Sequence, residues 1–256
     1  MSRSEAVGGQ RVVTILLAVA DLGPSVSVRE LADRTGIPQS SVYRYLKLLR
    51  VEGLVWTTRA GRYTVGPRAV QLAQRFTESF DLVAVCRPVM QRLASETQEP
   101  VALVVAVGHR AICVETVESR QGLRYSFTRG ATLPLLRGAS AKALLPYLRQ
   151  AVIERAMDEA GLDPAARATL WAEIARIRER GYAESEGEVD VGVWAVGVPI
   201  LAPGGQLLAA LSVIAPVARL DAARRQALRH MTLSAAESIY WRLDGREGNE
   251  RFVRRA

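Results

Sequence analysis

The strongest constraint on the fold is a series of helix start and stop signals within the first fifty residues. Apolar residues recur every three or four positions over residues 11–22, which predicts a helix with one buried face that ends at Gly23. Ser27 and Glu30 then form a Ser-x-x-Glu capping box, in which each side chain can satisfy an unpaired backbone N–H at a helix start. A short second helix is therefore predicted over residues 28–35.

The turn after this second helix identifies the motif. Gly36 can adopt the left-handed conformation that stops a helix, and a helical pattern resumes over residues 39–50. Two short strand-like runs follow, at residues 54–56 and 62–65, and their spacing predicts a hairpin. A helix, a helix-turn-helix and a hairpin together predict a winged-helix domain over residues 1–66.

The third helix of such a domain enters the major groove of DNA with its N-terminal residues at the base edges. Residues 1–66 hold nine Lys or Arg against five Asp or Glu, and this balance favours a polyanionic partner. A solvated basic face on a protein-binding three-helix module is the alternative. The side chains predicted to contact DNA are Gln39, Ser40, Ser41, Tyr43, Arg44 and Lys47 of the helix, with Arg59 and Arg62 of the hairpin.

Composition limits the partners and the compartment. The 256 residues are 49% hydrophobic and carry a formal charge of +8, yet only two of the 34 cationic residues are lysines, which coding bias explains as well as function does. Cys86 and Cys113 form neither a spaced metal pair nor a disulfide framework, and the apolar run at residues 12–20 is too short to span a membrane. We therefore expect a cytoplasmic protein that binds no membrane, metal or cofactor.

The rest of the chain alternates between helical and strand periodicity. We expect a linker helix over residues 67–79 and, over residues 80–256, an α+β domain whose antiparallel strands carry their helices on one side. The strand-like runs are residues 101–108, 111–117, 122–127, 191–200 and 206–214. The helical runs are residues 82–96, 140–150, 152–160, 164–180 and 221–243.

Four segments resemble the IclR family of bacterial transcriptional regulators. They are VSVRELADRTGIPQSSVYRYLKLLRVEGLV (26–55), LPLLRGASAKALL (133–145), RERGYAESEGEVDVGVWAVGVPI (178–200) and ALSVIAP (210–216). Many regulators share the first segment, whereas the other three occur in the order typical of this family. The resemblance spans nearly the whole chain. It implies a regulator that binds a palindromic double-stranded DNA operator as a homodimer or homotetramer and senses a small organic acid in a GAF/PAS-like effector domain.

The resemblance also implies an effector pocket between the sheet and the helix after Ser140. Because the implied set holds no Arg or Lys, we expect the acid's anionic group at the backbone N–H groups of this helix start. Ser185 replaces an Asp of many members and Ile214 a Ser, and these less polar residues favour an aromatic or otherwise apolar acid. The implied pocket residues are Gly122, Tyr125, Ala139, Ser140, Ser185, Val193, Ala195, Ser212 and Ile214.

Three other interpretations remain open for the second domain. The pocket residues can form a closed core, which would make the chain a ligand-independent architectural DNA-binding protein. The second interpretation is an enzyme that uses Ser140 as nucleophile and Lys142 as base. These residues lie in no Gly-x-Ser-x-Gly elbow and both histidines lie in other segments, so we expect no enzymatic activity. Acidic residues 184–190 can suggest a metal site, but a solvated loop braced by Glu188 explains them equally well.

Overall fold

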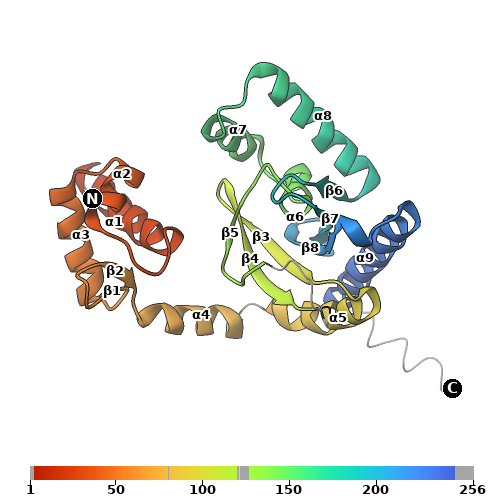
Figure 1. The fold of residues 1–256 in the computed structure, drawn as a ribbon, viewed down its shortest axis with the longest axis horizontal. Coiled ribbons are helices and arrows are strands. Elements are labelled where there is room, and N and C mark those ends of the chain that lie inside the picture. Colours follow the sequence, from red (N-terminus) through yellow and green to blue (C-terminus); the bar gives the residue numbers. More distant parts are fainter. Residues whose placement is uncertain (1–2, 80, 120, 122–126, 246–256) are drawn as a thin grey trace. The chain divides into compact units, whose positions relative to one another are not determined.

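The structure is a computed structural model that describes residues 3–79, 81–119, 121 and 127–245 (Figure 1). It divides into two compact units, Met1–Phe80 and Asp81–Ala256, and each unit is considered by itself. None of the helices in these described ranges is both long enough and apolar enough to cross a membrane. The implied pocket residues Gly122 and Tyr125, and most of the strand expected at residues 122–127, lie outside the described residues.

The first unit is a three-helix core with a two-stranded hairpin. Ile15, Leu31 and Leu46, one from each of the first three helices, are fully buried in its core. The two strands pair antiparallel, with Trp56 opposite Thr64. Its elements are α1 (Arg3–Asp21), α2 (Val28–Thr35), α3 (Gln39–Val51), β1 (Val55–Thr57), β2 (Tyr63–Val65) and α4 (Arg68–Ser79).

Local signals set the ends of α2 as predicted. The Ser27 hydroxyl accepts a hydrogen bond from the Glu30 N–H, and the Glu30 carboxylate accepts one from the Ser27 N–H at 2.6 Å. Gly36 takes a φ of 67° and its N–H bonds to the Ala32 carbonyl, which closes the helix. The capping box and the helix-turn-helix are both confirmed. α1, by contrast, begins at Arg3, earlier than the predicted residue 11.

The second unit is built on a six-stranded antiparallel sheet in the order β5-β4-β3-β8-β7-β6. The central pair, β3 and β8, joins segments more than a hundred residues apart in the chain, with Val101 opposite Val213. The strands are β3 (Val101–Val107), β4 (Arg110–Val117), β5 (Thr132–Pro134), β6 (Ala183–Glu186), β7 (Val193–Leu201) and β8 (Leu207–Pro216).

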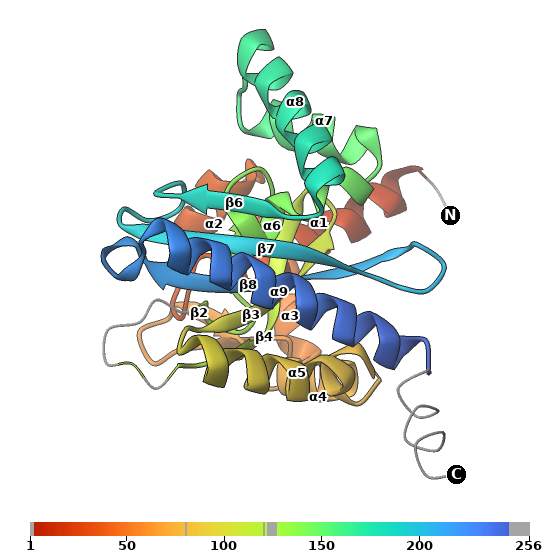
Figure 2. The ribbon, with the colours of Figure 1, turned by 90° about the vertical axis from the view of Figure 1, so that its right-hand side faces the viewer.

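Helices lie on both faces of this sheet, which corrects the expectation that they share one side (Figure 2). Along β7, Gly197 approaches the start of α6, whereas Trp194 lies under Arg225 of α9, and residues an odd number apart face opposite sides of a strand. α5 (Asp81–Thr97) and α9 (Ala222–Leu243) pack together on the α9 side. The remaining helical elements are α6 (Ala139–Lys142), η1 (Leu145–Tyr147), α7 (Gln150–Glu159), α8 (Pro164–Arg180) and η2 (Val217–Arg219).

Three elements differ from the sequence prediction. The single helix expected over residues 140–150 is instead the four-residue α6 followed by the turn η1, because Pro146 cannot donate to a continuing helix. Strands β5 and β6 were not predicted. They are three and four residues long, and β6 has the acidic sequence AESE, so neither carries an apolar strand pattern.

Candidate functional site

The outward face of α3 is the first candidate site. Its four apolar core positions, Val42, Tyr45, Leu46 and Leu49, are all buried, as the helical period predicts. The predicted contact residues Gln39, Ser40, Tyr43, Arg44 and Lys47 are exposed on this helix, and Ser41 is half-buried. The sequence therefore orients α3 correctly, and the polar side chains near its start are open to a partner.

Arg44 and Lys47 differ in how they are held on this face. The Arg44 guanidinium lies 5.1 Å from the centre of the Tyr45 ring and donates a hydrogen bond to the Tyr45 hydroxyl at 3.3 Å. This hydrogen bond holds the pKa of Tyr45 below its usual value. Lys47, and Arg59 of the hairpin loop, form no ion pair with any described residue. Arg44 is thus oriented in advance, while Lys47 and Arg59 are exposed charges without a described ion-pair partner.

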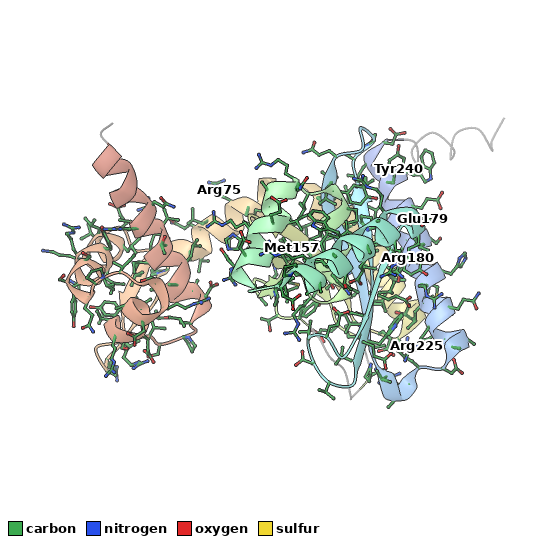
Figure 3. All side chains as sticks on the ribbon, turned by 90° about the horizontal axis from the view of Figure 1, so that it is seen from above. Arg75, Met157, Glu179, Arg180, Arg225 and Tyr240 are labelled. Carbon is green, nitrogen blue, oxygen red and sulfur yellow. The ribbon has the colours of Figure 1, made fainter. Side chains whose placement is uncertain are left out.

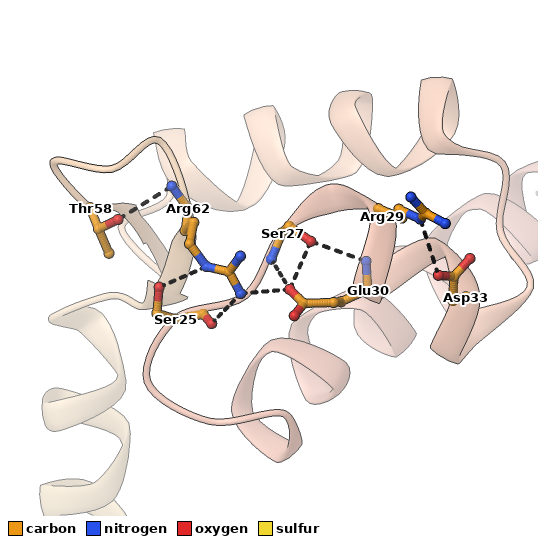
Figure 4. Close-up of polar contacts among 7 residues, drawn as sticks. All are labelled: Ser25, Ser27, Arg29, Glu30, Asp33, Thr58 and Arg62. Carbon is orange, nitrogen blue, oxygen red and sulfur yellow. Dashed lines mark hydrogen bonds and ion pairs between the residues drawn. The ribbon is translucent and has the colours of Figure 1, made fainter.

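Arg62 is engaged inside the unit (Figure 4). Its guanidinium forms an ion pair with Glu30 at 2.7 Å and donates to the Ser25 carbonyl at 2.9 Å and the Ser25 hydroxyl at 3.1 Å. The hydrogen bonds from Ser27, with a smaller contribution from Arg62, hold the pKa of Glu30 below its usual value. The sequence predicts a phosphate contact for Arg62, but its charge already joins the hairpin to the start of α2.

The second candidate site is a cavity beside the start of α6. Its volume is about 20 Å³, which is room for about one water molecule. Ser212 does not line it: this serine is fully buried, and its hydroxyl accepts a hydrogen bond from the Ser140 hydroxyl at 2.8 Å. Six of the implied pocket residues do line it, namely Ala139, Ser140, Ser185, Val193, Ala195 and Ile214.

Two glycines allow the close packing around this cavity. A Cβ on Gly197 of β7 would lie 2.4 Å from the Ala139 carbonyl oxygen, so α6 can rest on the strand only at a glycine. Gly138, at the N-terminal end of α6, has a φ of 80°, and a Cβ there would lie 2.9 Å from a methyl group of Val189. The segment 187–192 therefore covers the start of α6 in direct contact.

Two backbone donors at the start of α6, the N–H groups of Gly138 and Ala139, are already satisfied. The Gly138 N–H donates to the Glu188 carboxylate at 3.0 Å, and the Ala139 N–H donates to the Ser185 hydroxyl at 2.9 Å. The other Glu188 oxygen accepts from buried Lys142 at 2.6 Å, and Lys142 also contacts Glu173 at 2.6 Å. Glu188 thus braces the segment as expected. Two of the N–H groups around Ser140 that were predicted for an effector's anion, those of Gly138 and Ala139, therefore donate to the chain's own side chains.

Sequence reasoning missed part of the lining. Arg137 immediately precedes Gly138, and its guanidinium donates a hydrogen bond to the Glu188 backbone carbonyl. Its place in the quoted segment LPLLRGASAKALL was the available signal. The other additional lining residues come from loops, from β5 and from α6; they are Phe127, Leu133, Gly138, Ala141, Glu188, Val189 and Asp190.

The acidic residues near this cavity serve structural roles. Glu184 and Glu186 of β6 form ion pairs with α9, to Arg229 at 3.0 Å and to Arg225 at 2.5 Å. Figure 3 labels Arg225 on α9 and Met157, a fully buried core residue, on α7. Within the described ranges, no group of three His, Cys, Asp or Glu side chains is placed to hold a metal ion.

Comparison with known proteins finds a matching family model for each of the two units. The profile of the IclR helix-turn-helix domain matches residues 10–58, and that of the C-terminal domain of bacterial IclR transcriptional regulators matches residues 74–241. The chain is 29% identical to the acetate operon repressor of Salmonella typhimurium over 238 residues, which is 90% of this chain and 87% of that protein. It is 30% identical to the HTH-type transcriptional regulator KipR of Bacillus subtilis over 222 residues, 84% of this chain and 89% of that protein. A crystal structure of an IclR family regulator from Brucella abortus has the same fold, with a TM-score of 0.79 at 20% identity over 93% of each chain.

Proposed function

The chain belongs to the IclR family of bacterial transcriptional regulators, and from this premise we propose that it binds a palindromic DNA operator and responds to a small aromatic or otherwise apolar acid. The family makes it a DNA-binding regulator with an effector domain, and its curated relatives are regulators rather than enzymes. The observation that carries the DNA-binding role is the exposed polar face of α3 above four buried apolar residues.

In this proposal the residues of α3 divide between sequence recognition and charge. Gln39, Ser41 and Arg44 near the helix start contact base edges, where Arg is suited to bidentate hydrogen bonds with guanine. Lys47 and Arg59 contact phosphates, because exposed cations without an ion-pair partner neutralise the DNA backbone without reading sequence. Arg62 holds the hairpin against α2 and so sets the position of Arg59. Ser40 and Tyr43 complete the contact face.

A palindromic operator requires two copies of the first unit in a fixed relation. Exposed apolar residues on α1 support self-association, since Val13 is 55% exposed and Leu17, one helical turn later, is 58% exposed. We propose a homodimer or homotetramer. Light scattering is expected to give two or four times the mass of one chain, and a monomer both with and without DNA would contradict the assembly.

The effector part of the proposal depends on the apolar lining of the cavity. Leu133, Val193, Ala195 and Ile214 surround it together with Phe127, so an apolar or aromatic body has complementary surface. The cavity must widen before it admits such a body, because it now has room for about one water. The segment 187–192 covers the start of α6 and is the part of the wall that we expect to move.

The decisive experiment measures fluorescence anisotropy on DNA from upstream of the protein's own gene, with shuffled DNA as the control. We expect preferential binding to the upstream DNA and a change in affinity when a matching aromatic or aliphatic acid is added. Equal binding to both DNAs would contradict the regulatory role.

A ligand-independent DNA-binding protein is the second candidate, and the narrow cavity is the observation that favours it. Melting temperature distinguishes the two, because a ligand that binds only the folded state raises it. If no acid in the panel changes either the melting temperature or the DNA affinity, this second candidate replaces the effector proposal.

A further inference from the structure

Arg137 is the cation that lines the effector cavity, and its charge is available. Its side chain is exposed, and its bond within the described part of the chain goes to the neutral Glu188 carbonyl rather than to a carboxylate. Lys142, the other cation nearby, is 3% exposed and held at 2.6 Å by both Glu173 and Glu188. Arg137 can therefore accept an anion without leaving a buried acid unpaired.

Two of the backbone donors at the start of α6, the N–H groups of Gly138 and Ala139, offer a poorer place for an anion because each already donates to a side chain. To reach the Gly138 N–H, a ligand carboxylate would displace the Glu188 carboxylate, and the two negative charges would repel each other. To reach the Ala139 N–H, it would displace the Ser185 hydroxyl. At Arg137 the same carboxylate replaces a single hydrogen bond to a carbonyl with a charge-assisted and bidentate pair, which is the stronger interaction.

The two acidic side chains of the lining, Glu188 and Asp190, do not prevent a ligand carboxylate from binding at Arg137. Glu188 is held by Lys142 and the Gly138 N–H, and Asp190 has an interaction partner of its own. Among the described residues that line the cavity, Arg137 is the only cation, and its hydrogen bond goes to a backbone carbonyl and not to a carboxylate.

We propose that Arg137 selects carboxylates at this site, exchanging the Glu188 carbonyl for the carboxylate of the effector. This inference rests on the proposed effector function. Its consequence is that the ligand's acid lies at the rim beside residues 187–190, while its apolar body points toward Val193, Ala195 and Ile214. The same exchange releases one of the bonds that hold the covering segment, so anion binding and opening of the cavity favour each other.

The test compares acids with their uncharged amides on matched variants. Benzoate, phenylacetate and butanoate are titrated beside benzamide, phenylacetamide and butanamide, with Kd measured by calorimetry on full-length protein. Arg137→Gln removes the charge, Arg137→Lys keeps it but loses the bidentate geometry, and Arg149→Gln is the control. Arg149 is also exposed in this unit but lies outside the cavity lining.

Wild type and Arg149→Gln are expected to bind at least one acid better than its amide. Arg137→Gln should weaken that acid by about tenfold or more and bring the acid-to-amide ratio close to one, with Arg137→Lys intermediate. Circular dichroism confirms that each variant is folded.

Three results would overturn the inference, and they are distinguishable. If the acid binds Arg137→Gln as tightly as wild type, or if the amides bind wild type as well as the acids do, the pocket stands but Arg137 does not select the anion. If wild type binds none of the six compounds, the acid-effector function itself fails, and the role of Arg137 fails with it.

Discussion

The two units present their functional residues in opposite ways. On α3 the polar side chains are exposed and Lys47 has no described ion-pair partner, so DNA can bind without displacing any contact of this lysine. Beside α6 the donors of Gly138 and Ala139 are satisfied by the chain itself, and the cavity has room for about one water. Affinity for DNA should therefore reflect direct contacts, whereas affinity for an effector includes the cost of opening the wall.

Substituting the two lysines of the chain should give the largest difference between the exposed face of α3 and the internally bonded groups beside α6. Lys142→Met leaves Glu173 and Glu188 without their buried cation and should lower the free energy of unfolding of the second unit by about 3 kcal/mol, because breaking such a pair strands its charges. Lys47→Met, the same change on an exposed face, should alter stability by less than about 0.5 kcal/mol. Hydrogen exchange measures each unit separately. Similar losses for both variants would contradict the contrast.

Arg44→Ala should give the next largest effect, on DNA rather than on stability. Arg44 is oriented by the Tyr45 ring and hydroxyl, so its contribution to base recognition should be specific. We expect a loss of about 1 to 3 kcal/mol in affinity for the operator and a relaxed preference at one position of the site. An affinity that falls equally for operator and shuffled DNA would show that Arg44 contacts only the backbone.

Lys47→Ala sharpens the same distinction with a smaller change. Removal of a lysine that contacts a phosphate should weaken binding to all sequences alike and lower the slope of log affinity against log salt by about one unit. Anisotropy titrations at several salt concentrations measure the slope. An unchanged slope would remove Lys47 from the contact face, and Arg59→Ala is the matched variant on the hairpin.

The smallest expected effect is the pH dependence of the first unit. Hydrogen bonds from Ser27 lower the pKa of Glu30 in the folded state, so the carboxylate stabilises the fold above its unfolded pKa, and this contribution is lost as the pH falls through the lowered value. In Glu30→Gln, the free energy of unfolding should therefore fall less steeply as the pH drops below about 4.5 than it does in wild type. Urea unfolding across that range tests it, with Glu52→Gln as control. If both variants lose stability at low pH as steeply as wild type, the Glu30 carboxylate does not contribute to the pH dependence of unfolding.

What could be predicted from sequence follows the range of each interaction. The ends of α2, the left-handed Gly36 and the buried face of α3 depend on residues within one or two turns of each other, and these predictions are confirmed. The linear pattern also placed β3, β4, β7 and β8, because their apolar runs are long. It could not place β6, whose acidic residues become a strand through pairing with β7 and through ion pairs with α9.

By itself, the sequence determined a winged helix, the orientation of its third helix and an α+β second domain, since periodicity and capping are local properties. Only the tertiary structure decided that Ser212 is absent from the cavity lining, that Glu188 accepts from the Gly138 N–H and that Arg137 belongs to the lining. The physical reason is that the lining of this cavity is assembled from β5, α6, β6, β7, β8 and loop residues such as those of segment 187–192. Its electrostatics depend on distances between side chains that are far apart in the chain.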